Sequence, residues 1–334
     1  MAMRLVQLQR GDARRVALVD EPYLRPLAHV ESIYGLAQEA MALDTPLVKL
    51  VGQCPTVGRL NYDEVYTGAA QWRLQLPVEH PIDPARCLVS GTGLTHLGSA
   101  ANRQAMHGKT EAELTDSMKM FRLGVEQGRP PAGTIGASPE WFYKGSGAIL
   151  RAHGEPLDVP AYALDGGEEA EIAGVYVIDP SGRPRRIGMT IGNEFSDHKF
   201  ERLNYLNLAG SKIRTCAIGP ELVIDPAFDR VAGSVSIERD GATLWSRSIA
   251  TGEAEMCHSL ANLEHHHFKF EAHRRPGDLH VHYYGAHSLS VGDGIETRDG
   301  DVMVVEFEGF GRALRNPVRV APPPAACISV RALV

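Results

Sequence analysis

Three glutamates, Glu169, Glu171 and Glu194, have the residue type and spacing to hold a metal ion. Side chains two positions apart on a strand point to the same face, so Glu169 and Glu171 project together from a predicted strand. Two like charges side by side on a sheet destabilise it. A hard divalent cation such as Mg²⁺ or Ca²⁺ resolves this repulsion because it prefers carboxylate oxygens. The pair alone favours a solvated acidic strand start, whereas the third carboxylate and the residues after it favour a metal site.

Further motifs accompany these glutamates in order along residues 77–320. Asn193 precedes Glu194, and Lys212 follows ahead of a Gly-Pro pair. Three other segments belong to the series: residues 139–144, 275–278 and 300–318. On these motifs the chain resembles the fumarylacetoacetate hydrolase family, in which the Glu-x-Glu pair and the later acidic residue bind the metal and the lysine completes the site.

The resemblance implies a fold, a cofactor and an assembly. The expected fold is α+β and mainly β, a mixed β-sandwich roll with the metal site at its open end, usually in a dimer. The expected cofactor is Mg²⁺, with Mn²⁺ as the alternative, bound by Glu169, Glu171 and Glu194. The partners that follow are a small-molecule 2-oxo acid substrate and further copies of the chain.

Departures from the family pattern indicate which branch the chain is most similar to. The carbon–carbon hydrolases of the family carry a His-x-x-Glu pair, but here His96 is followed three positions later by Ser99. Without that carboxylate the imidazole lacks the partner that would orient it and raise its basicity, which argues against hydrolysis. His198 replaces a family arginine, and Tyr284 lies in an altered loop. The pattern most resembles the dehydratases of 2-keto-3-deoxy sugar acids.

This resemblance implies a metal-dependent lyase acting on a sugar acid in sugar catabolism, with a pentonate giving 2-oxoglutarate semialdehyde. Lys212 is the candidate base, with a pKa that a nearby cation lowers, and His96, His198 or a water could protonate the leaving hydroxyl. The candidates for substrate binding are Lys144, Ser99 and Tyr284. Two alternatives stay open: a C–C bond hydrolase or decarboxylase acting on diketo or oxo-dicarboxylic acids, and a non-catalytic metal-binding or ligand-binding protein.

Bulk properties exclude other classes of protein. The 334 residues carry a net charge of −7 with no basic run, which argues against nucleic-acid binding. No apolar run reaches the roughly 18 residues that a membrane span needs, and no signal peptide is recognisable near Met1. The five cysteines are odd in number, scattered and without a Cys-x-x-Cys pair, which predicts a reducing cytoplasm.

The chain divides into a small α/β module, residues 1–85, and a catalytic domain, residues 86–334. Within the module, residues 15–19 predict a strand and residues 27–42 a helix. A second helix is expected over residues 110–127, with one stripe packed in the core: Leu114, Met118, Phe121 and Val125. The proline run at 322–324 predicts a tail.

The run His265-His266-His267 stands near several other histidines, including His280 and His282. Neighbouring residues in such a run point in different directions, and the His-Glu-x-x-His pattern of a zinc site is absent from the sequence. The run therefore favours a solvated helix face over a zinc site.

Overall fold

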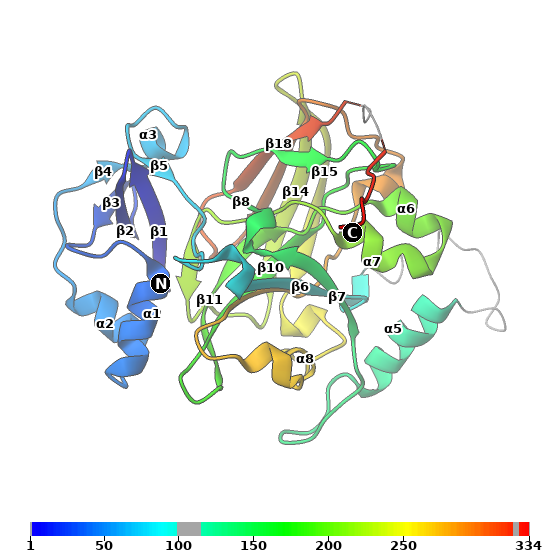
Figure 1. Ribbon diagram of the computed structural model, residues 1–334, viewed down its shortest axis with the longest axis horizontal. Helices are drawn as coiled ribbons and strands as arrows, with labels where there is room; N and C mark the ends of the chain where they lie inside the picture. Colours follow the sequence, from blue (N-terminus) through cyan, green and yellow to red (C-terminus); the bar gives the residue numbers. More distant parts are fainter. Residues whose placement is uncertain (1, 99–114, 323–326, 334) are drawn as a thin grey trace.

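The computed structural model describes residues 2–98, 115–322 and 327–333, and two β-sheets dominate it (Figure 1). The larger sheet has thirteen strands, ten of them in the order β4-β3-β2-β1-β13-β11-β10-β16-β6-β7. Its pairings are mostly antiparallel, but β16 and β6 pair in parallel. The strands central to the site are β6 (Cys87–Gly93), β7 (Glu140–Ser146), β10 (Ala170–Ile178), β11 (Pro184–Asn193) and β16 (Leu279–Tyr283).

Short strands extend this sheet and curl it into a roll. β12 pairs with both β11 and β8, and β8 follows β7 in the chain, so the sheet bends round toward its own edge. The Tyr283 hydroxyl donates a hydrogen bond to the Ala217 carbonyl of β12 across the interior, at 2.9 Å. The bounds of these shorter strands are β8 (Leu150–Arg151), β12 (Cys216–Ile218) and β13 (Leu222–Ile224).

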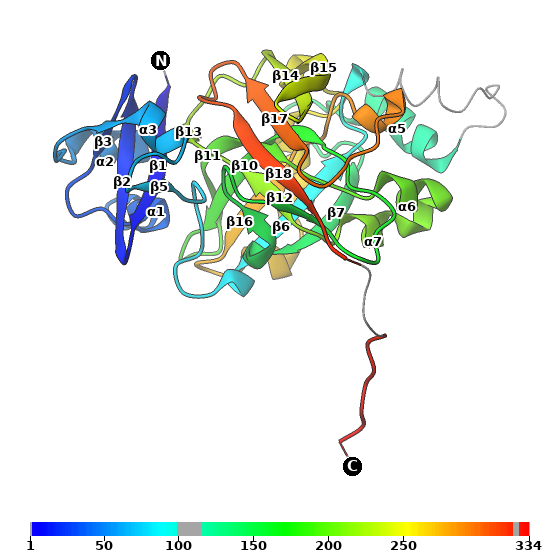
Figure 2. The ribbon, with the colours of Figure 1, turned by 90° about the horizontal axis from the view of Figure 1, so that it is seen from above.

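The second sheet has five strands in the order β15-β14-β17-β18-β9. It packs against the first through a shared apolar core, in which Ile172 and Ile191 of the large sheet meet Val235 and Val305 of the small one. Figure 2 shows β17 and β18 crossing over β10 and β11. The bounds are β9 (Leu157–Val159), β14 (Val231–Arg239), β15 (Ala242–Thr251), β17 (Val302–Phe307) and β18 (Leu314–Val320).

The N-terminal strands continue the large sheet, because β1 pairs with β13. The predicted strand at residues 15–19 is confirmed within β2. The predicted helix at 27–42 begins later, at Ile33, because the Ser32 side chain caps it and His29 has a φ of 59° that no α-helix allows. The bounds in this part are β1 (Met3–Arg10), β2 (Ala13–Asp20), β3 (Tyr23–Pro26), α1 (Ile33–Ala42), α2 (Leu47–Gln53), β4 (Leu60–Asn61), α3 (Tyr62–Tyr66) and β5 (Arg73–Leu74).

The mainly β fold with mixed sheets agrees with the predicted fold class. The division of the chain at residue 85 stays a prediction, since the hydrogen-bonded sheet runs across it. Through the described ranges, no helix has the length and apolarity to cross a membrane. The remaining α-helices are α5 (Asp116–Gln127), α6 (His198–Leu203), α7 (Leu208–Lys212) and α8 (Leu260–Phe268).

The prediction that the α5 stripe packs in the core is wrong. Val125 is 50% exposed, Met118 and Phe121 are half-buried, and Leu114 lies outside the described residues. Gly124 is the one buried residue of α5, and it lies against Cys257 and His258. The helix lies at the side of the protein (Figure 1), and its apolar stripe is half-buried to exposed.

The prediction of a solvated histidine run is also wrong, because the face of α8 that carries His267 packs on β16. His267 forms a buried histidine cluster with His280 and His282. The His267 Nε2 lies 3.0 Å from His280 Nδ1, and the His267 ring stacks on that of His282 at 4.3 Å between centroids. Burial, together with the neighbouring histidines, lowers the pKa of His280 and of His282 to about 3.

Candidate metal and active site

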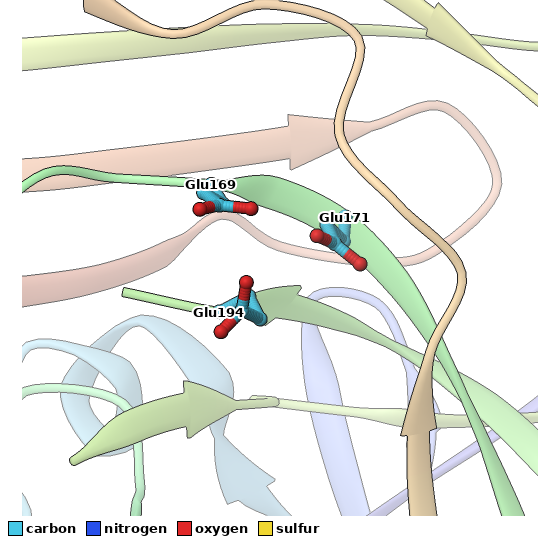
Figure 3. A group of neighbouring side chains, drawn as sticks. All are labelled: Glu169, Glu171 and Glu194. Atoms are coloured by element: carbon cyan, nitrogen blue, oxygen red, sulfur yellow. The ribbon is translucent and has the colours of Figure 1, made fainter. Parts of the chain in front are cut away.

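The β10–β11 hairpin brings the three glutamates together (Figure 3). Glu171 lies on β10 opposite Gly192, Glu169 precedes β10, and Glu194 follows β11, where its backbone N–H donates to the Glu169 carbonyl at 2.9 Å. One carboxylate oxygen from each glutamate lies within 4.8 Å of the others. All three side chains are buried. The predicted grouping of these residues is therefore present in the structure.

Asn193, the last residue of β11, fixes the backbone around the site. Its side-chain oxygen accepts hydrogen bonds from the Glu169 N–H at 3.1 Å and from the Phe195 N–H at 3.2 Å. Phe195 has a φ of 27°, which turns the chain sharply after Glu194. The asparagine thus ties the two ligand-bearing ends of the hairpin to each other.

Two lysines neutralise much of the acidic charge. The Lys212 Nζ, at the end of α7, lies 2.6 Å from Glu169 Oε1 and 2.5 Å from Glu194 Oε2, and it donates to Ser196 Oγ at 3.0 Å. The Lys144 Nζ, from β7, pairs with Glu194 and also donates to the Phe195 carbonyl at 3.0 Å. Buried carboxylates need such partners, because an unpaired charge in a protein interior is costly.

The pKa of Lys212 lies above its ordinary value: burial lowers it, but Glu169 and Glu194 raise it by more. The lowered pKa expected from the sequence refers to the site with a cation bound beside the ammonium, and it stays a prediction; the neighbours that raise the pKa here are carboxylates. Burial raises the pKa of Glu169, but Lys212 and His198 lower it by more, so this pKa lies well below its usual range. Lys212 and Glu169 therefore form a charged pair in this structure.

Among the three carboxylates, Glu171 is the one with too few hydrogen-bond donors around it in the described residues. Its Oε2 accepts a hydrogen bond from the Gly285 N–H at 2.6 Å, whereas its Oε1 is buried and has no hydrogen-bond partner among the residues that the structure describes. Burial and the charges of Glu194 and Glu169 raise the pKa of Glu171 well above its usual range. A divalent cation would fill this deficit, so the three glutamates fit a hard metal ion such as Mg²⁺.

His198 is the predicted site histidine that lies beside the triad. As the first residue of α6 it follows Asp197, whose side chain caps the helix through the Phe200 N–H at 2.9 Å. Its Nε2 lies 2.9 Å from Glu169 Oε1, and its Nδ1 is buried with no hydrogen-bond partner in the described part of the chain. Burial lowers the pKa of His198, but the bond to Glu169 outweighs this effect and the pKa is raised.

Two other predicted residues are buried in hydrogen-bonded networks, and a third lies outside the described residues. His96 is fully buried, with its ring nitrogens 3.0 Å from Thr95 Oγ1 and 2.8 Å from Thr251 Oγ1. The Tyr284 hydroxyl lies 2.5 Å from that of Tyr176 in a buried network. Ser99 lies outside the described residues. Burial lowers the pKa of His96 to about 3, so its imidazole is neutral.

A pocket of about 390 Å³ opens beside the glutamates. The start of α5, the α6 region and the segment around Leu289 form its walls. Its lining residues are Thr115, Ser117, Met118, Glu169, His198, Glu201, Arg202, Tyr205, Leu289 and Val291. This volume suits a small-molecule ligand.

Sequence reasoning missed several residues of this region. Ser196 accepts a hydrogen bond from Lys212 and donates one to Glu194 at 3.1 Å. Glu168 is fully buried and accepts hydrogen bonds from both the N–H and the hydroxyl of Ser290, at 2.6 Å each, which anchors the loop that carries Leu289. The adjacent pair Glu168-Glu169 was a signal for Glu168, because neighbouring side chains in an extended segment point to opposite faces, so that only one of the two can join Glu171.

Comparisons with known proteins identify the fold. No family model matches the chain, and no curated protein sequence matches it. Among solved structures, a 2-keto-3-deoxyarabinonate dehydratase is 19% identical with a TM-score of 0.70, and the match covers 96% of this chain and 99% of that chain. A 2-keto-3-deoxy-D-arabinonate dehydratase complexed with magnesium and 2,5-dioxopentanoate is 18% identical, with a TM-score of 0.69 and coverages of 96% and 99%.

A third structure, a 5-carboxymethyl-2-hydroxymuconate delta-isomerase from Mycobacterium smegmatis, is 18% identical with a TM-score of 0.56, and the match covers 96% of this chain and 100% of that one. At these identities the likeness establishes the fold. The chain therefore has the fold shared by these dehydratases and isomerases, and the fumarylacetoacetate hydrolase-like fold predicted from the sequence resemblance is confirmed.

Proposed function

We propose that the protein is a magnesium-dependent dehydratase that removes water from a 2-keto-3-deoxy sugar acid, a pentonate in the first instance. The observation that carries the proposal is the buried group Glu169, Glu171 and Glu194, in which Lys212 makes direct contact and one carboxylate oxygen has no hydrogen-bond partner among the described residues. The similarity in fold to a dehydratase complexed with magnesium and 2,5-dioxopentanoate supports the substrate class, since that compound is 2-oxoglutarate semialdehyde.

Bound Mg²⁺ would polarise the 2-keto oxygen of the substrate and, by neutralising the carboxylates around Lys212, would favour its neutral amine. The Lys212 amine then takes a proton from C3. The C4–O bond breaks, and the hydroxyl leaves as water with a proton from His198, which lines the pocket. The unsaturated product loses a C5 proton and gains one at C3, which gives an enol. The enol then loses its O5 proton and gains one at C4, which gives the aldehyde with the net loss of one water.

The other predicted residues take supporting roles in this proposal. Lys144 is fully buried on Glu194, so it orients a metal ligand. His96 lies between the hydroxyls of Thr95 and Thr251, and its part in proton transfer stays a prediction. Arg202 is a cation of the pocket lining and is the residue we assign to the polar groups of the substrate. Contacts of Lys144, Ser99 and Tyr284 with substrate stay predictions.

The test is turnover of 2-keto-3-deoxypentonates before and after chelation with EDTA, with detection of the aldehyde product. We expect product with magnesium, loss of product after chelation, and recovery when magnesium is restored. Cleavage or decarboxylation of diketo acids, with no dehydration, would show that the hydrolase or decarboxylase alternative is correct. Metal binding without turnover on any 2-oxo acid would show a non-catalytic binding protein.

A further inference from the structure

The loop between β16 and β17, residues 284–301, contributes an apolar wall to the pocket through Leu289 and Val291. These two side chains offer no hydrogen bonds to a polar substrate, so they act on it through shape. A wall that acts through shape must stand at a fixed place relative to the metal glutamates. The contacts that hold this loop therefore matter for substrate binding.

Two contacts tie the ends of the loop to the segment that carries the metal glutamates, residues 166–171. Near the start of the loop, the Gly285 N–H donates to Glu171 Oε2 at 2.6 Å. Near its end, the Thr297 hydroxyl donates to the Gly166 carbonyl. Both contacts lie several residues away from the part of the loop that lines the pocket, so that part needs a contact of its own.

Glu168 supplies this middle contact, and it uses both of its carboxylate oxygens. Oε1 accepts a hydrogen bond from the Ser290 N–H and Oε2 accepts one from the Ser290 hydroxyl, each at 2.6 Å. Ser290 stands between Leu289 and Val291 in the chain, so the contact fixes the part of the loop that lines the pocket. Glu168 is fully buried, and burying a carboxylate is costly unless donors such as these satisfy it.

The position of Glu168 in the chain links the wall to the metal site. Glu168 is next to Glu169, and neighbouring side chains of an extended segment point to opposite sides. Glu169 joins the metal group, whereas Glu168 holds the loop. A single peptide unit therefore separates the residue that binds the metal from the residue that holds the wall.

We propose that Glu168 is a positioning residue, which sets the affinity for substrate by holding Leu289 and Val291 in place beside the metal glutamates. The inference rests on the proposed function, because it concerns the substrate of that site. The groups assigned to proton transfer lie on other elements, His198 on α6 and Lys212 on α7. Loss of the contact should therefore raise KM more than it lowers kcat, since a loosened wall must be ordered again whenever substrate binds.

The alternative role for Glu168 is electrostatic, as a fourth carboxylate near the metal. Glu168→Gln removes the charge but keeps both hydrogen bonds, because the amide oxygen accepts from the Ser290 N–H and the amide nitrogen donates to the Ser290 hydroxyl oxygen. Glu168→Ala removes the charge and the hydrogen bonds together. Comparing the two variants therefore separates positioning from charge.

Steady-state kinetics with a 2-keto-3-deoxypentonate at saturating magnesium test the proposal. Glu168→Ala should raise KM by about 10-fold and change kcat by less than about 3-fold, whereas Glu168→Gln should keep both values of the unmodified chain. Glu221→Ala is the matched control and should keep KM, since Glu221 is also fully buried and bonded, to Tyr62 at 2.8 Å, but is not among the described lining residues. An unchanged KM in Glu168→Ala, or an equal rise in Glu168→Gln, would overturn the proposal.

Hydrogen exchange of the Ser290 amide is a second readout, and it needs no turnover. Exchange should be at least about 10-fold faster in Glu168→Ala and unchanged in Glu168→Gln, because only alanine removes the acceptor. Unchanged exchange in Glu168→Ala would show that the contact does not hold the loop, and the proposal would fail. If the unmodified chain turns over no 2-oxo acid, the proposed function fails instead, and exchange still decides whether Glu168 holds the loop.

Thermal unfolding of each variant shows whether it folds. If Glu168→Ala does not fold, Ser290→Ala takes its place, because it removes one of the two hydrogen bonds and keeps the one from the backbone. Its KM should then rise by about 3-fold at nearly constant kcat. An unchanged KM in Ser290→Ala would count against the proposal in the same way.

Discussion

Acid should weaken this fold through the histidine cluster, His267, His280 and His282. In the unfolded chain a histidine has a pKa of about 6.5. The folded pKa values of His280 and His282 are lowered to about 3, because both side chains are buried and the neighbouring histidines disfavour a further positive charge. A group whose folded pKa is the lower one binds fewer protons when folded. The free energy of unfolding therefore falls as the pH drops below about 6.5.

The size of the effect follows from these pKa values. Between about pH 7.5 and about pH 5.0, each of the two histidines lowers the free energy of unfolding by about 2 kcal/mol. The reason is that the histidine binds a proton in the unfolded chain but stays neutral in the folded one. Together His280 and His282 cost about 4 kcal/mol, a large share of the roughly 5–15 kcal/mol that stabilises an ordinary domain. His267 adds to the cost, because burial and its histidine neighbours lower its pKa as well.

The assay is urea unfolding at both pH values for the unmodified chain and for His280→Gln/His282→Gln. Over this pH interval the free energy of unfolding should fall by about 4 kcal/mol more in the unmodified chain than in the double variant. Other groups that titrate here, such as Glu194 and His198, are present in both proteins and cancel in the difference. His265→Gln, an exposed change on the same helix, is the control. An equal pH-dependent fall of the free energy of unfolding in both proteins would refute the reasoning. If the double variant does not fold, His280→Gln alone should remove about half of the roughly 4 kcal/mol difference.

Three further predictions concern the site. Glu171→Gln should weaken magnesium binding by about 100-fold or more in calorimetry while leaving the metal-free protein at least as stable, because it removes a like charge; unchanged affinity would exclude Glu171 as a ligand. Lys212→Ala should lower kcat by about 10²–10⁴-fold, and a variant that keeps most of its turnover would exclude Lys212 as the base. Tyr284→Phe should cost about 1 kcal/mol in urea unfolding, since its hydroxyl bonds Tyr176, and it should raise KM; an unchanged KM would contradict the predicted contact of Tyr284 with substrate.

The metal group could be predicted because its information is local. A Glu-x-Glu pair fixes which face two carboxylates share, and a hairpin partner places Glu194 opposite them. The burial of Lys144 could not be predicted in this way, because it depends on how the roll brings β7 toward the end of β11. Only the family resemblance connected that lysine to the site.

The two errors share a cause. A period of 3.6 residues in α5 identifies an apolar stripe, but it does not say whether a core lies opposite Val125. In the same way, the histidine run gives no sign that β16, which carries His280 and His282, covers one face of α8. Sequence patterns describe one element at a time, whereas burial is a property of two elements that meet.

The strand order of the large sheet has a consequence for how the protein is made. β16 lies between β10 and β6, so β7 with Lys144 can join the glutamate hairpin only after residues 279–283 exist. At typical synthesis rates, the ribosome reaches β16 roughly 5–20 s after completing the hairpin. We expect the three carboxylates to stay hydrated during that interval, because such long-range pairings form late. Pulsed hydrogen exchange during refolding should then protect the amides of β10 no earlier than those of β16.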